Sequence, residues 1–233
     1  MIALLGVQPP DSAVVVSRQI THLPDSTYWS HYDAFAVGCL DYFEVEQTLA
    51  WYAQMRRARP GVPLLLVADP ADCAKVLAKT DSITGIIPPA ELVGHRLPSS
   101  AFEELCQASI QGGLWREVVA VLEPAAAEQK ETLQAVIARA AKGGSIQRSA
   151  NDLNLAPATV HRRFRKLELA AGRFASAIRV RSYQLRIANG ASPRDALRAC
   201  GWSHQEARRK AMRRLGKPHD GSGWVVLASL EER

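Results

Sequence analysis

The stretch SIQRSANDLNLAPATVHRRFRKL, residues 145–167, decides how the C-terminal part of the chain folds. Ser145 can cap a short helix, NLAP makes a turn, and Pro157 suits the first position of a second helix. Both helices have an apolar side at helical spacing, formed by Ile146, Ala150 and Leu153 in the first and by Val160, Phe164 and Leu167 in the second. Two short helices joined by a tight turn form a helix-turn-helix unit.

The second helix of this unit has an outer face of small, polar and basic residues. At 100° per residue, the side chains opposite the apolar stripe are Ala158, Thr159, Arg162, Arg165 and Lys166. A face of this composition is typical of a helix that enters the major groove of DNA.

The same organisation returns in ASPRDALRACGWSHQEARRKAMRRLGKP, residues 191–218. Ser192 and Pro193 open a short helix, Gly201 makes the turn, and a basic helix follows. Its inner side is Ala207, Ala211 and Leu215, and its outer side is Glu206, Arg209, Lys210 and Arg213. Helical periodicity over 174–190 predicts a connecting helix, and 131–145 predicts a helix before the first unit. We therefore expect an all-α C-terminal domain with two helix-turn-helix units.

Charge divides the chain in the same way. Residues 1–129 hold 8 Lys and Arg against 15 Asp and Glu, a net charge of −7, whereas residues 130–218 hold 20 against 5, a net charge of +15. An acidic part joined to a strongly basic part predicts that only the basic part meets a polyanion. Double-stranded DNA is the first candidate.

These segments resemble the DNA-binding region of the AraC/XylS family of transcription regulators. The likeness covers 130–218 and is carried by SIQRSANDLNLAPATVHRRFRK, IRVRSYQLRIA and DALRACGWSHQEARRKAMRRLGKP. Gly201-Trp202-Ser203 stands where the family has Gly-Phe-Ser, and Arg181 matches the basic residue of its connecting helix. Arg208 and Met212 replace two aromatic positions of the family pattern. The resemblance implies that one chain places two recognition helices in successive major-groove segments.

The directions of the side chains give each residue an expected role. We expect base contacts from Thr159, Arg162, Lys166, Gln205, Glu206 and Arg209. We expect phosphate contacts from Arg163, Arg165, Arg181 and Arg213.

The N-terminal part alternates short apolar runs with amphipathic segments. Helices are predicted over 43–61, 70–80 and 99–111, and nearly continuous apolar runs lie between them, which favours a small parallel α/β sheet. The run AVVVSRQI is interpreted as a strand, although a helix followed by a strand would be usual at that place.

Residues 1–112 resemble the receiver domain of response regulators through YDAFAVGCLD, RRARPGVPLLLVA and ITGIIPPAEL. The positions that the family uses for phosphorylation hold other residues here. The acidic pair is replaced by Gly6-Val7-Gln8, the phosphoaccepting aspartate aligns with Gly38, and the hydroxyl and lysine positions fall near Val67-Ala68 and on Pro88. We therefore expect a receiver-like domain that is not phosphorylated and holds no metal. Its expected role is dimerisation or the sensing of a ligand or a partner protein.

The expected domains are 1–122 (receiver-like), 123–130 (linker), 131–218 (double helix-turn-helix) and 219–233 (tail). Trp115, Val118, Val119 and Leu122 share one helix face, which can either form a dimer or pack on its own domain. The tail, GWVVLASLEER, is open to three interpretations: an added edge strand, a packed tail or an interface contact.

The remaining sequence features favour a cytoplasmic regulator without catalysis. No nucleotide, metalloprotease or hydrolase motif occurs, so we expect no enzyme activity and no cofactor. The cysteines are about 30 or more residues apart and no secretory signal or membrane span is predicted. Expected partners are double-stranded DNA and a second copy of the chain, a homodimer. Two alternatives stay open: a helix-turn-helix scaffold that binds RNA polymerase or another regulator, and a nucleoid-type protein that binds DNA without sequence preference.

Overall fold

The structure, a computed structural model, describes residues 1–11, 17–59, 61–77, 83–122, 126–215 and 223–230. It divides into two compact units, Met1–Gly113 and Leu114–Arg233. The division falls at 113, inside a helix, and not after residue 122 as the sequence suggested. Helix α3 (Ser99–Val119) continues from the predicted 99–111 segment across this boundary.

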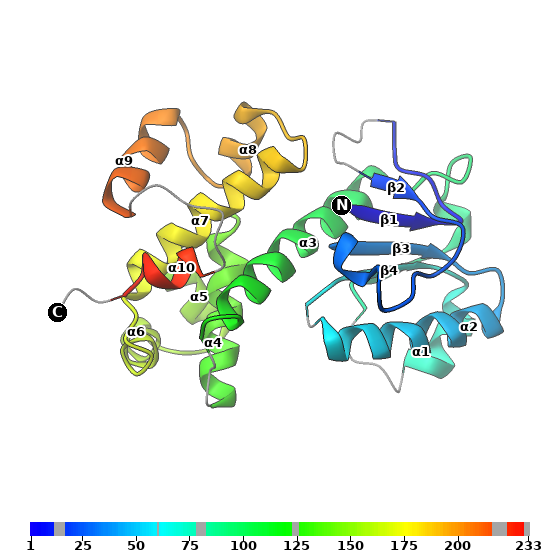
Figure 1. The fold of residues 1–233 in the computed structure, drawn as a ribbon, viewed down its shortest axis with the longest axis horizontal. Coiled ribbons are helices and arrows are strands. Elements are labelled where there is room, and N and C mark those ends of the chain that lie inside the picture. The colour runs from blue at the N-terminus through cyan, green and yellow to red at the C-terminus, as the bar shows by residue number, and fades with distance from the viewer. Residues whose placement is uncertain (12–16, 60, 78–82, 123–125, 216–222, 231–233) are drawn as a thin grey trace. The chain divides into compact units, whose positions relative to one another are not determined.

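A parallel five-stranded sheet forms the centre of the N-terminal unit (Figure 1). Its strands are β1 (Ile2–Leu5), β2 (Ser17–Gln19), β3 (Ala34–Gly38), β4 (Leu64–Val67) and β5 (Gly85–Ile87). The order is β2-β1-β3-β4-β5, with every neighbouring pair parallel. This confirms the predicted parallel α/β sheet. Only 17–19 of the run AVVVSRQI are seen as a strand, because residues 12–16 lie outside the described part.

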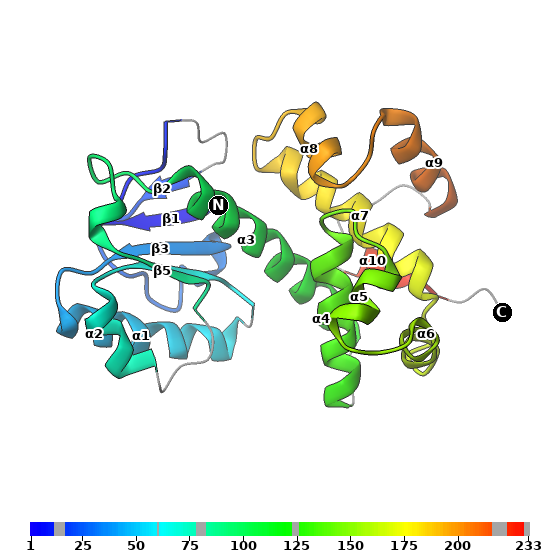
Figure 2. The ribbon, with the colours of Figure 1, turned by 180° about the vertical axis from the view of Figure 1, so that it is seen from behind.

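Helices cover both faces of this sheet (Figures 1 and 2). Helices α1 (Tyr42–Ala58) and α2 (Pro70–Leu77) lie on one face, where Val45, Leu49, Tyr52 and Met55 of α1 are buried as predicted. The first half of α3 lies on the other face through Phe102 and Leu105. Since successive strand residues point to opposite faces, Ala3 joins the first core and Ile2 and Leu4 the second. Two 3₁₀ turns, η1 (Trp29–His31) and η2 (Pro89–Glu91), complete the unit.

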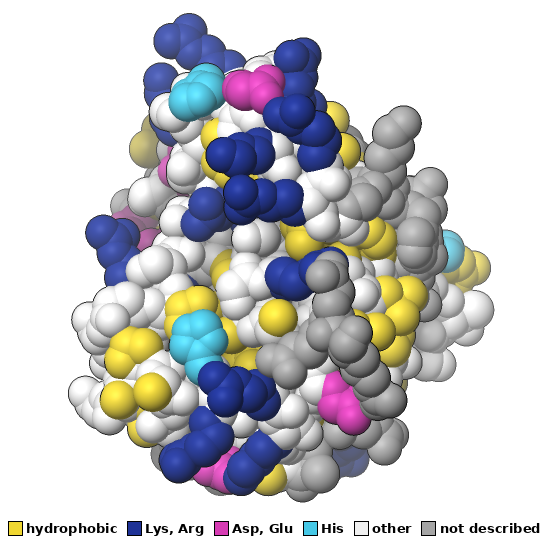
Figure 3. Space-filling view, turned by 90° about the vertical axis from the view of Figure 1, so that its left-hand side faces the viewer, with side chains coloured by type: hydrophobic (Ala, Val, Ile, Leu, Met, Phe, Trp, Pro, Cys, Tyr) yellow, Lys and Arg dark blue, Asp and Glu magenta, His cyan; other side chains and the backbone are white. Residues whose placement is uncertain are grey.

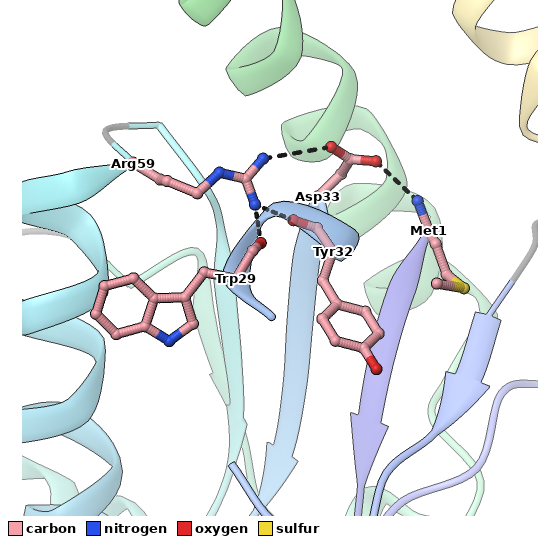
Figure 4. A network of polar contacts seen from close by, with 5 residues as sticks. All are labelled: Met1, Trp29, Tyr32, Asp33 and Arg59. Carbon is pink, nitrogen blue, oxygen red and sulfur yellow. Dashed lines mark hydrogen bonds and ion pairs between the residues drawn. The ribbon is translucent and has the colours of Figure 1, made fainter. Parts of the chain in front are cut away.

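A polar network closes the edge at which β1 and β3 begin (Figure 4). The Arg59 guanidinium donates to the carbonyl oxygens of Trp29 and Tyr32, the latter at 2.7 Å, and lies 3.9 Å from the Asp33 carboxylate. Asp33 also accepts from the Met1 amine at 2.7 Å. Burial lowers the pKa of Arg59, and Asp33 opposes that shift. The charged groups and backbone carbonyls at this edge of the sheet therefore bond to one another. The opposite edge, where the strands have their carboxyl ends, is not part of this network.

The C-terminal unit is helical, as predicted. Besides the end of α3 it contains α4 (Ala127–Ala140), α5 (Ile146–Asp152), α6 (Pro157–Arg165), α7 (Ala171–Ala188), α8 (Pro193–Ala199), α9 (Gln205–Leu215) and α10 (Trp224–Leu227). The start signals identified in the sequence are observed: Ser145 Oγ accepts from the backbone N–H of Arg148, Ser192 Oγ accepts from that of Asp195, and Pro157 opens α6. Helices α5 and α6 pack against each other, α8 and α9 follow one another in the chain, and α7 packs against all four.

One expectation from the sequence needs correction, and the structure decides two alternatives that the sequence left open. Residues 127–130 of the predicted linker belong to α4, whereas 123–125 lie outside the described residues. The tail contains a short helix and packs on its own unit, because Trp224, Val225 and Val226 are buried and the backbone N–H of Ala170 donates to the carbonyl of Ser229. The proposed dimer face is largely buried within the chain: Trp115 and Val118 are 7% and 0% exposed.

Two glycines bring the two helix pairs into direct backbone contact. Gly143 precedes α5 and Gly201 forms the turn after α8, and both have left-handed backbone, with φ of +79° and +68°. A Cβ placed on Gly143 would lie 2.6 Å from the carbonyl oxygen of Cys200, and one on Gly201 would lie 2.9 Å from the Gly143 Cα. Only glycine fits either position, for space as well as for dihedral angle.

Side chains of helix α7 stabilise this backbone contact through hydrogen bonds. Its Arg179 donates to the carbonyl oxygens of Gly143 and Gly144 at 2.8 and 3.3 Å, and its buried Ser182 donates to that of Ala141 at 3.0 Å. Burial lowers the pKa of Arg179, so its charge depends on these carbonyl contacts for compensation. The connecting helix thus fixes both helix pairs at one place.

A stack of four side chains extends from the same point to α9. The Arg179 guanidinium lies over the Trp202 ring at 5.9 Å, Trp202 meets Tyr183 edge-on at 6.2 Å, and Tyr183 lies under the Arg208 guanidinium at 4.7 Å. Arg208 therefore packs α9 on α7 through a cation–π contact at a position where the AraC/XylS pattern has an aromatic residue.

Gly143→Ala and Gly201→Ala should each destabilise the C-terminal unit by about 2 kcal/mol or more, since the added Cβ meets backbone and the left-handed angle disfavours alanine. Gly172→Ala is the matched control, because Gly172 is helical and exposed, and a Cβ added there would meet nothing within 4 Å. Urea unfolding followed by tryptophan fluorescence measures the difference. Equal stability of all three variants would show that the glycine contact is unimportant.

Candidate nucleic-acid interface

Helix α6 presents the first group of predicted DNA-contacting residues. Its inner side is fixed by Val160 and Phe164, the latter edge-on to Phe174 of α7 at 5.1 Å. Its outer side carries the exposed Arg162, Arg165 and Lys166, and Thr159 beside them is half-buried. Among the described residues these three cations have no ion-pair partner. The face is therefore positively charged and free of internal neutralisation.

Helix α9 presents the second group. Gln205, Glu206, Arg209 and Arg213 are all exposed and lie on one face, as predicted. Glu206 accepts from Arg213 at 2.6 Å and lies 3.9 Å from Arg209. Ion pairs this exposed contribute between 0 and about 1 kcal/mol, so a competing phosphate can replace the carboxylate at little cost.

The basic side chains gather in two places on one face of the C-terminal unit. Figure 3 shows Lys and Arg side chains over α9 in the upper part of the view and over α6 in the lower part. Lys210 and Arg214 add to the α9 group, both exposed.

Two of the predicted phosphate contacts are already engaged inside the protein. Arg163 bonds to Glu128 and Thr132 of α4, at 3.0 Å to the carboxylate and 2.9 Å to the hydroxyl, and its side chain is only 15% exposed. Arg181 pairs with Glu117 of α3 at 2.8 Å, with side chains 19% and 10% exposed. These arginines anchor α6 and α7, so the interface proposed below uses Arg165 and Arg213 for phosphates and leaves Arg163 and Arg181 out.

The residues that orient the interface were not identified from the sequence. Arg179, Ser182 and Gly143 tie the two helix pairs together, yet none lies on an outer face. The Cys200 thiol donates to Ser182 Oγ at 3.7 Å, and burial raises its pKa, so it stays a neutral core group. The sequence offers one sign of this arrangement, the glycines that follow α4 and α8. Glycines at these positions predict turns, but they do not reveal that the two turns contact each other.

The N-terminal unit carries the positions discussed for phosphorylation at the carboxyl ends of its strands. Gly38 ends β3, Val67 ends β4, and Gly6 and Pro88 directly follow β1 and β5. Asp41, near this edge, caps α1 by accepting from the backbone N–H of Glu44, whereas Asp33 lies at the opposite edge of the sheet, in the polar network of Figure 4. In the described part of the chain no three His, Cys, Asp or Glu side chains group as metal ligands would.

Comparison with known proteins adds no relative. No family model matches the chain, and neither the curated proteins nor the solved structures include a match. Within the described ranges, no helix has both the length and the apolar character that crossing a membrane requires. None of the four cysteines forms a disulfide bond.

Arg181→Met should cost about 3 kcal/mol of stability, because it leaves the Glu117 carboxylate buried without its cation. Adding Glu117→Gln to that variant should restore most of the loss. Thermal unfolding of the two variants and the parent chain measures this. If Arg181→Met leaves stability unchanged but weakens duplex binding and its salt dependence, Arg181 is a phosphate contact after all.

Proposed function

We propose that the chain is a sequence-specific, double-stranded-DNA-binding transcription regulator of the AraC/XylS type, active in the cytoplasm and independent of phosphorylation. One observation carries the proposal: two exposed basic helices, α6 and α9, each follow a shorter helix and a tight turn, and both pack on α7. A single solvated basic face is common on protein surfaces. Two that are held in one frame within a segment of charge +15 favour nucleic acid.

Affinity and specificity come from different side chains in this proposal. Arg165 and Arg213, with Lys210 and Arg214 beside them, neutralise phosphates and release counterions, so binding weakens as salt rises. Thr159, Arg162 and Lys166 face base edges from α6, where arginine pairs well with guanine. Gln205 and Arg209 do so from α9, and Glu206 can accept from a cytosine amino group.

In this proposal the first helix pair contributes more to the recognition of DNA bases than the second. The three cations of α6 have no ion-pair partner in the described part of the chain, whereas Arg209 and Arg213 share the carboxylate of Glu206 before DNA arrives. We expect α6 to carry most of the base discrimination and α9 to extend the site.

The N-terminal unit is proposed to be receiver-like and to regulate without phosphotransfer. Its strand order is the flavodoxin-like one, 2-1-3-4-5. Glycine at position 38 offers no carboxylate to phosphorylate. A homodimer remains part of the proposal, although the buried Trp115 and Val118 do not support the surface that the sequence suggested for it.

Selection of a random duplex library on the full-length protein tests the proposal. The winning duplex is then titrated against a scrambled duplex at two salt concentrations. An enriched motif that spans two adjacent major-groove segments supports a regulator that uses both helices, and a single short motif supports reading by α6 alone. Salt-sensitive binding without enrichment supports the nucleoid-type alternative. Absence of binding contradicts the proposal and favours the scaffold that binds RNA polymerase or another regulator.

Arg162→Ala should weaken binding to the selected duplex by about 1–3 kcal/mol and relax specificity at one position. Arg165→Ala should weaken selected and scrambled duplexes alike and reduce the slope of log K against log salt by about 1. Arg57→Ala, an exposed arginine of α1 in the other unit, is the charge-matched control and should change neither quantity. Fluorescence anisotropy over a salt series measures all three, and identical losses for Arg162→Ala and Arg165→Ala on both duplexes would refute the division of roles.

A further inference from the structure

A cavity of about 990 Å³ opens at the carboxyl edge of the sheet in the N-terminal unit. It lies where β1 and β3 end, and these are the strands at which the sheet order reverses, since β2 lies outside β1 and β4 outside β3. In open parallel sheets this switch point is where ligands bind. The volume is that of a site for a drug-sized molecule.

The floor of the cavity is made of backbone. Gly6 and Gly38 face each other there, and a Cβ on Gly6 would lie 3.5 Å from the Gly38 carbonyl oxygen. Gly6 has a left-handed backbone, with φ of +69°. A Cβ on Gly38 would come within 3.3 Å of the Val7 side chain. The strand ends therefore approach one another closely at the floor of the cavity.

A tight turn forms part of the rim. Val93 and Arg96 exchange backbone hydrogen bonds, so Gly94 and His95 are its two central residues, both left-handed with φ of +59° and +64°. The His95 carbonyl accepts from the backbone N–H of Gln8, which fixes the turn beside the end of β1. A non-glycine residue in this conformation is strained, and such strain concentrates at functional sites.

The charge of the cavity selects its ligand. Among the described residues that line it there is no lysine or arginine, and Glu44 is the only carboxylate. One oxygen of Glu44, Oε2, accepts from the backbone N–H of Leu40 at 2.6 Å, so the carboxylate is held at the mouth. Its other oxygen has no hydrogen-bond partner in the described residues. An anionic ligand such as a nucleotide would therefore meet repulsion, whereas a protonated amine would find an acceptor.

The walls of the cavity are largely apolar, with contributions from Leu5, Val7, Leu23, Val37, Val67 and Leu92. The polar side chains of Thr21, Gln47, Thr48 and His95 also line it. Leu40 at the mouth is 93% exposed. Apolar walls with one charged group at the entrance fit a molecule that has an apolar body and a charged end. We propose that this cavity binds a small aliphatic or aromatic amine, with the apolar body between the strand ends and the ammonium group against Glu44.

The role of such an amine as the effector of a transcription regulator rests on the proposed function, but its binding does not. The experiment is therefore made without DNA, and it can succeed even if the chain binds no duplex. Full-length protein is titrated by calorimetry with tryptamine, tryptophol and indole-3-propionate, which share an indole body and differ in the charge of the end group.

We expect tryptamine to bind saturably at one site, tryptophol about tenfold more weakly and indole-3-propionate more weakly still. Glu44→Gln keeps an acceptor for Leu40 but removes the charge, so tryptamine should fall to the affinity of tryptophol. Glu46→Gln is the matched control, since Glu46 is exposed on the same helix and does not line the cavity. It should behave as the parent chain does.

A second pair of variants tests the place of binding. Thr21 is exposed and lines the cavity, so Thr21→Trp should block it and remove tryptamine binding, whereas His22→Trp, on the adjacent exposed residue, should not. The proposal is overturned if no probe binds, if indole-3-propionate binds as tightly as tryptamine, or if Glu44→Gln or Thr21→Trp leaves tryptamine affinity unchanged.

Discussion

The close approach of Gly143 and Gly201 is the constraint on which the C-terminal unit depends. At this point the backbone before α5 touches the backbone after α8, and no side chain separates them. Arg179 bonds to the carbonyl oxygen of Gly143 and stacks on Trp202 beside Gly201. Two segments that lie far apart in the sequence are therefore fixed to each other at one point of backbone contact. Helix α6 packs on α5, which begins beside this point, whereas α9 is held by its packing on α7.

The cations of the C-terminal unit fall into two groups, those with internal partners and those without. Cations that have internal partners, such as Arg163 with Glu128 and Arg181 with Glu117, hold the frame together. The exposed cations on the outer face of α6 have no ion-pair partner in the described part of the chain. In the N-terminal unit the only carboxylate among the described residues that line the large cavity is Glu44, and its neighbour Asp41 is used up in capping α1.

Much of this architecture could be predicted from the sequence, because its signals are local. Ser145, Pro157 and Ser192 start helices through contacts within three residues, and the apolar stripe of α1 needs only the helical period. The roles of Arg163 and Arg181 could not be predicted, since their partners lie 31–35 and 64 residues away. For the tail the sequence left an edge strand, a packed tail and an interface contact open, and the structure has the packed tail, with Trp224-Val225-Val226 helical although its composition suits a strand. The outer faces of α6 and α9 were predicted correctly, whereas the ion pair network on α9 depends on rotamers that the sequence does not specify.

Helix α3 has a consequence for the modularity of the chain. It is continuous from Ser99 to Val119, and the division between the compact units falls within it. Phe102 and Leu105 complete the core under the sheet, whereas Leu114 and Val118 are buried beyond the division. No loop separates the two units at this division, so the chain could not be divided there without interrupting α3. A variant in which one unit was exchanged for another domain would have to include or rebuild α3, since this helix contributes to both units.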